Sequence, residues 1–69
     1  MNQTEFEKEY KYLMNFLETH GSHIGMKACV RKYNAEETHR PFKLKTDGSA
    51  IIILTPNARF NTVISVVDV

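Results

Sequence analysis

Three histidines and one cysteine are the residues that most readily suggest metal chemistry in this chain. His20 and His23 lie three positions apart, and Cys29 and His39 follow them. A zinc site needs such ligands to converge tetrahedrally, and strong zinc-binding sequences carry paired ligands such as Cys-x-x-Cys. No such pair is present, and the two closest histidines fall at a predicted helix end and in a turn. We therefore expect no metal ion and no cofactor.

Residues for covalent or acid–base catalysis are equally sparse. A nucleophile needs an oriented base beside it, whereas Cys29 lies between Ala28 and Val30, where a small buried thiol is the ordinary interpretation. The adjacent carboxylates Glu36 and Glu37 lie in a polar segment and are explained as solvated surface. The three glycines are dispersed singly, so no loop that cradles a phosphate is present. No group of residues passes the first test for an active site, and we expect that the protein is not an enzyme.

A cluster of cations gives a stronger signal. Six lysines and arginines fall within the nineteen residues from Lys27 to Lys45. If the segments that carry them are neighbouring strands, their side chains could merge into one patch that suits a phosphate backbone. The competing interpretation is that lysines solvate the outer face of a strand and protect its edge. The candidate nucleic-acid-binding residues are Lys27, Arg31, Arg40, Lys43 and Lys45.

The N-terminal third of the chain predicts one amphipathic helix over residues 4–20. Thr4 and Glu7 have the spacing of a capping box at its start. Gly21 has the residue type that commonly follows a helix end. Apolar residues recur at steps of three and four along one face. This stripe consists of Phe6, Tyr10, Leu13 and Leu17, with Met14 beside it.

The rest of the chain predicts strands. Met26, Ala28 and Val30 alternate with polar residues at the period of a half-buried strand. The polar segment 34–41 is expected to be a loop, or a single helical turn begun by Asn34. Further along, Asp-Gly between two apolar runs predicts a hairpin with a type I′ turn. The predicted strands cover residues 26–33, 42–46, 50–54 and 60–69.

These elements predict an α+β fold in a single domain, residues 1–69. The N-terminal helix is expected to pack on a mainly antiparallel sheet of three to four strands. A lone cysteine, Cys29, fits a reducing compartment. The N-terminus has no basic segment followed by an apolar one, and the longest apolar run is five residues, far short of a membrane span. We therefore expect a cytoplasmic protein with no membrane association.

The two C-terminal segments are apolar on both faces, and this is the main functional indication. One helix can cover only one face of a sheet, so the other face needs a partner protein or a second copy of the chain. Two other possibilities are that the loop 34–41 folds over that face, or that the sheet curls into a small barrel. Alternation assigns Ile51, Ile53, Val63, Val67 and Val69 to one face, and Ile52, Leu54, Ile64 and Val66 to the other.

We therefore predict a small intracellular protein-interaction module, such as an inhibitor, an adaptor or a phage-type effector. It would act through an apolar sheet face or an edge strand, and a homodimer is expected. Tyr12 and Phe16 lie beside the main helical stripe and are expected to be the more exposed aromatic pair. The predicted partner-binding residues are Tyr12, Phe16, Val63, Val67 and Val69. The alternative is a small nucleic-acid-binding protein that uses the cationic residues.

Overall fold

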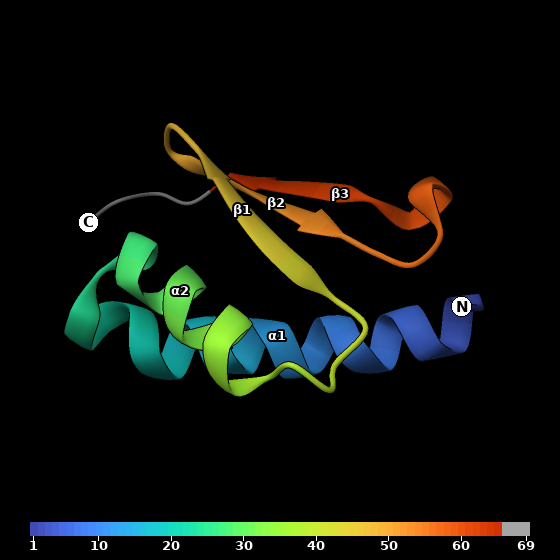
Figure 1. Ribbon diagram of the computed structural model, residues 1–69, viewed down its shortest axis with the longest axis horizontal. Helices are drawn as coiled ribbons and strands as arrows, with labels where there is room; N and C mark the ends of the chain where they lie inside the picture. The colour runs from blue at the N-terminus through green and yellow to red at the C-terminus, as the bar shows by residue number, and fades with distance from the viewer. Residues whose placement is uncertain (66–69) are drawn as a thin grey trace.

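The computed structural model describes residues 1–65, with the side chains of Ser22 and Ser65 excepted. Two helices pack side by side on one face of a three-stranded antiparallel sheet (Figure 1). The predicted α+β class is therefore confirmed. The elements are α1 (Gln3–Ile24), α2 (Met26–Glu36), β1 (Lys43–Asp47), β2 (Ala50–Leu54), the 3-10 helix η1 (Ala58–Phe60) and β3 (Thr62–Ser65).

The first helix is longer than predicted at both ends. The side chain of Asn2, rather than that of Thr4, caps it by accepting a hydrogen bond of 2.8 Å from the Glu5 backbone N–H. At the other end the helix continues through Gly21, and Gly25 terminates it with a φ of 82°. Gly21 has a packing role instead, since a Cβ there would lie 2.8 Å from Met26 Sδ. The missing side chain lets α2 begin close to the last turn of α1.

The predicted strand over residues 26–33 is wrong, because this segment is helix α2. Met26, Ala28 and Val30 do alternate, but the residues that the fold buries are Cys29, Val30 and Tyr33. Together with Met26, which packs against the core, they follow the spacing i, i+3, i+4, i+7 of a helical face. The same residues fit both the period of a strand and the period of a helix. The helix period also places the large side chain of Tyr33 on the buried face.

The sheet is a meander in the order β1-β2-β3, and the predicted hairpin is present with a different turn. Asp47 pairs with Ala50, so the loop consists of Gly48 and Ser49. Gly48 has a φ of 61°, and no residue other than glycine has a positive φ in the described part of the chain. A positive φ at only the first loop position is typical of a type II′ turn, not the predicted type I′.

The core lies between the helices and the inner face of the sheet. Tyr33 of α2 is fully buried and meets Phe16 of α1 edge-on, with the ring centroids 5.2 Å apart. A second aromatic group surrounds Phe6, whose ring lies 5.6 Å from Phe42 and 5.5 Å from Phe60. The buried core residues are Leu13, Phe16, Leu17, Cys29, Val30, Tyr33, Phe42, Leu44, Ile51 and Ile53.

Asn34 fastens α2 to the edge strand β1. Its Nδ2 donates a hydrogen bond of 2.9 Å to the Leu44 carbonyl oxygen, and its Oδ1 accepts one of 3.0 Å from the Leu44 N–H. The side-chain amide thereby satisfies the two peptide groups that a neighbouring strand would otherwise pair. Asn34, predicted to begin a loop, instead lies in the last part of a helix and protects one edge of the sheet.

Leu13 tests the packing of the helices on the sheet. Its side chain is fully buried, as its place in the apolar stripe predicted. We expect Leu13→Ala to lower the free energy of unfolding by about 2–5 kcal/mol, through lost apolar contacts and the cavity left behind. The exposed Lys11→Ala should change it by no more than about 0.5 kcal/mol. Urea unfolding of both variants measures these changes, and equal unfolding midpoints for the two variants would contradict this placement of Leu13.

Candidate interaction surface

The outer sheet face, turned away from the helices, has an apolar centre beside two lysines. We define it by Lys43 and Lys45 of β1, Ile52 and Leu54 of β2, and Val63 of β3. Lys45, Ile52 and Val63 are register partners across the three strands, and Lys43 pairs with Leu54. Val63 is 63% exposed and Leu54 is 40% exposed, whereas Ile52 is half-buried. An apolar strip therefore runs across the sheet from the lysine-bearing strand to the opposite edge.

The predicted grouping of the strand residues is wrong for β3. Ile51 pairs with Ile64, and both turn toward the helices, where Ile64 packs against the core. Val63 therefore shares its face with Ile52, not with Ile51 and Ile53 as predicted. A shift of one residue in register moves every side chain of a strand to the other face. Val67 and Val69, also predicted to bind a partner, lie outside the described residues.

Neither alternative cover for this face is found in the described part of the chain. The connection between α2 and β1 runs along the helix layer and does not cross the outer sheet face (Figure 1). The described strands form an open sheet in which β1 and β3 are its two edges, not neighbours in a barrel. Among residues 1–65, the outer sheet face is left facing solvent.

Tyr12 and Phe16 do not lie on this surface. Phe16 is only 8% exposed and packs in the core, so the prediction that it is exposed is wrong. Tyr12 is half-buried, and the Arg40 guanidinium lies 3.6 Å from the centre of its ring. Its hydroxyl donates a hydrogen bond of 2.7 Å to Glu37 Oε1. Both aromatic side chains therefore hold the two helices and the following loop together.

The fold distributes the predicted cationic residues over α2, β1 and the segment between them. Lys27 and Arg31 are exposed and lie four residues apart on α2, while Lys43 and Lys45 are exposed on β1. Arg40 is not available to bind a phosphate, because it is half-buried in ion pairs with carboxylates of its own chain. Four of the five candidate nucleic-acid-binding residues therefore remain at the surface, on two different elements.

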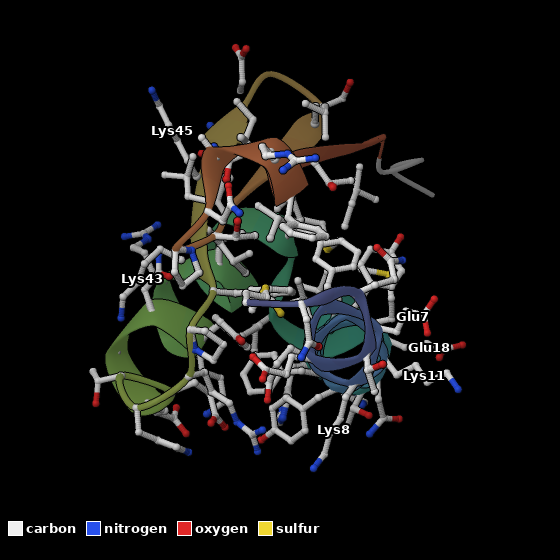
Figure 2. All side chains as sticks on the ribbon, turned by 90° about the vertical axis from the view of Figure 1, so that its right-hand side faces the viewer. Glu7, Lys8, Lys11, Glu18, Lys43 and Lys45 are labelled. Carbon is white, nitrogen blue, oxygen red and sulfur yellow. The ribbon has the colours of Figure 1, made fainter. Side chains whose placement is uncertain are left out.

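The lysines of β1 and the charged side of α1 lie on different sides of the molecule. Figure 2 shows Lys43 and Lys45 on one side, and Glu7, Lys11 and Glu18 on the other. Lys43 and Lys45 share the exposed face of β1 with Asp47, so the charge on the β1 side of the outer sheet face is positive on balance. An oppositely charged border on a partner would be attracted there.

A polar network that sequence reasoning missed joins α1 to the segment after α2. Arg40 Nη1 donates to both carboxylate oxygens of Glu9, each at 3.3 Å, and Arg40 Nε lies 3.5 Å from Glu37 Oε2. Glu9 and Tyr12 are three residues apart on α1, and so are Glu37 and Arg40 in the later segment. This paired spacing was a signal, but it became meaningful only once the two segments were known to be neighbours.

The network changes the acidity of its own members. The hydrogen bond from the Tyr12 hydroxyl lowers the pKa of Glu37 below its ordinary value of 4.5, and contact with Arg40 acts in the same direction. The same hydrogen bond raises the pKa of Tyr12. Both groups therefore keep their ordinary charge states at neutral pH, as expected of a structural network.

Tyr33 adds a buried hydroxyl that has no hydrogen-bond partner within the described residues. Burial, together with the nearby Glu9 carboxylate, raises the pKa of Tyr33 to about 12. Burial also raises the pKa of the Cys29 thiol, so this thiol is less readily ionised than a free one. Neither group has the lowered pKa or the accessibility of a nucleophile or a general base at neutral pH.

Comparison with known proteins adds no relative: no family model, no curated protein and no solved structure matches this chain. Within residues 1–65, no cluster of three or more histidine, cysteine or acidic side chains could hold a metal ion. Neither of the two described α-helices combines the length and the hydropathy that crossing a membrane requires.

The network predicts an acid-sensitive fold. Because the pKa of Glu37 is lower in the folded chain, its contribution to stability is complete above pH 4.5 and is lost as the pH falls below that value. We expect Tyr12→Phe to bring the pKa of Glu37 closer to its ordinary value and to weaken this dependence. Carboxyl titration followed by NMR measures it, with Tyr10→Phe as the control. An unchanged pKa of Glu37 in Tyr12→Phe would contradict the assigned cause.

Tyr33→Phe gives a second test, because it removes a buried hydroxyl that has no protein partner. An unsatisfied buried polar group costs about 1–3 kcal/mol, so we expect this variant to be at least as stable as the wild type. At high pH the difference should widen, since an unfolded tyrosine ionises near 10 and Tyr33 in the fold near 12. Thermal unfolding between these pH values is the measurement, and a clear loss of stability at neutral pH would contradict the prediction.

Proposed function

We propose that this protein is a small interaction module that binds a partner protein through the outer sheet face. The observation that supports this most strongly is the strip formed by Ile52 and Val63 beside Lys45, with Leu54 next to it. Exposed apolar side chains that are contiguous, with a polar border, are typical of protein contact sites.

The lysines on β1 favour a particular kind of partner. A matching surface would offer an apolar patch to Leu54 and Val63, and carboxylates to Lys43 and Lys45. Charge complementarity of this kind speeds association and selects against partners with a basic border. An inhibitor or adaptor that acts by covering a site on a larger protein fits this chemistry. We also propose a cytoplasmic location, because the single cysteine, Cys29, is free and buried.

We propose binding rather than catalysis as the main role. Cys29 and Tyr33 are buried and their pKa values are raised. Glu9, Glu37 and Arg40 are already paired with one another, so they hold no free base or acid at the surface. Binding therefore accounts for the exposed residues better than a reaction does.

A matched pair of charge substitutions tests the proposed surface. Leu54 is 40% exposed on the outer sheet face, and Ile24 is 46% exposed at the end of α1, away from that face. We expect Leu54→Glu to weaken binding of proteins retained from a lysate of the source cell by tenfold or more, about 1.4 kcal/mol. Ile24→Glu should retain them as the wild type does. Equal retention by both variants would contradict the use of this face.

Binding of nucleic acid, the alternative function, is tested with the same purified protein. A gel-shift at low salt with mixed-sequence DNA and RNA compares the wild type with Lys43→Glu plus Lys45→Glu. We expect no tight binding by either form, because Arg40 is engaged internally and the remaining cations are few. Tight, salt-sensitive binding that the double variant abolishes would favour the nucleic-acid alternative over the protein partner.

A further inference from the structure

The outward-facing peptide groups at the two edges of the sheet differ in whether they have hydrogen-bond partners. At β1, the Asn34 side chain takes both peptide groups of Leu44. In an antiparallel ladder, the N–H and C=O of one residue point to the same side, and successive residues alternate. Leu44 therefore points away from β2, and Lys45 points toward it. Since Lys45 pairs with Ile52, the peptide groups of Ile52 point toward β1.

The same alternation fixes the direction of the peptide groups in β3. Ile51 and Ile53 must point toward β3, where they pair with Ile64 and Thr62. Ile64 and Thr62 therefore use their peptide groups within the sheet. Val63, between them, directs its N–H and C=O outward at the open edge, and β3 has no strand on that side in the described part of the chain.

Within residues 1–65, this open edge is short, at four residues, and carries no chemical protection against pairing. Natural sheets protect an exposed edge with charged side chains, proline, a bulge or a covering segment. The four residues of β3 are Thr62, Val63, Ile64 and Ser65, without a charge or a proline, and the register with β2 runs without a bulge. The lysines that could protect an edge lie on β1, which Asn34 already covers.

We propose that two copies of the chain pair through their β3 strands in an antiparallel, twofold-symmetric arrangement. The Val63 N–H of each copy then donates to the Val63 carbonyl oxygen of the other. A second copy fits this edge because twofold symmetry requires a strand that is its own antiparallel complement, and an uncharged strand meets itself without repulsion. The product is one continuous sheet of six strands.

The charge distribution favours this edge-to-edge arrangement over stacking of two outer faces. In the six-stranded sheet the two Lys45 residues are five strand spacings apart, about 24 Å. That distance is well beyond the screening length of about 8 Å at physiological ionic strength. Stacked outer faces lie about 10 Å apart, so stacking with β1 over β1 would bring the lysines of both copies close together. Edge pairing also places the two Val63 side chains together, so that the apolar strips of the two copies join.

This inference concerns self-association and goes beyond the proposed function. It stands if no partner protein is found for the outer sheet face. If this inference fails, the proposed function can still hold, because a monomer could still bind a partner through Leu54 and Lys45.

Sedimentation equilibrium of the wild type and four preparations tests the pairing. We expect the wild type to be a dimer. Val63→Lys and Val63→Glu should each be monomers, because like charges would lie side by side across the twofold axis. Their equimolar mixture should form dimers again. Leu54→Lys, on the outer sheet face but one strand away from the open edge, should remain a dimer.

Three sedimentation results would overturn the proposal: a wild type that is monomeric throughout the soluble concentration range, a Val63→Lys variant that still dimerises, or a Leu54→Lys variant that dissociates as stacked faces would. Circular dichroism checks that each variant is folded, which the 63% exposure of Val63 favours.

Amide hydrogen exchange gives a second readout. The Val63 N–H should exchange slowly in the wild-type dimer, and the N–H at position 63 should exchange rapidly in monomeric Val63→Lys. Fast exchange in the wild type would also contradict the pairing.

Discussion

The return of α2 along α1 is the constraint on which the rest of the structure depends (Figure 1). Gly25 ends the first helix in a conformation with positive φ, and Gly21 leaves room for the start of the second. With the helices side by side, Tyr33 meets Phe16 in the core. The same return brings Asn34 to the backbone of β1. The tight connection at Gly25 thus positions both the aromatic pair in the core and the Asn34 side chain that supports the sheet.

Packing both helices on one face divides the sheet into two chemically different surfaces. The inner face is filled by Leu44, Ile51 and Ile53, which are at most 5% exposed. The outer sheet face has no helix to cover it among the described residues and keeps Leu54 and Val63 in solvent. Residues 1–65 contain no further helix that could take that role. The apolar strip is therefore open to solvent in the described part of the chain, and this is the feature on which the proposed binding role rests.

The polar network fixes the connection that leads from the helices to the sheet. Glu37 and Arg40 lie in that connection, and their partners Glu9 and Tyr12 lie on α1. Pairs of this kind contribute little when fully exposed, but these side chains are at least half-buried and share hydrogen bonds. The network restrains the segment before β1, so the edge strand reaches Asn34 in register.

The sequence by itself determined the α+β class, the apolar stripe of α1 and the two strands of the first hairpin, because local periodicity and turn residues specify them. Only the tertiary structure decided three other features. Residues 26–33 carry both a strand and a helix period, and burial of Tyr33 selects the helix. The face of Val63 depends on how η1 sets the register of β3, which no local pattern encodes. Arg40 forms an internal ion pair with Glu9, which lies thirty-one residues away in the sequence. Only the fold brings such distant charges together, so the sequence could not predict this pair.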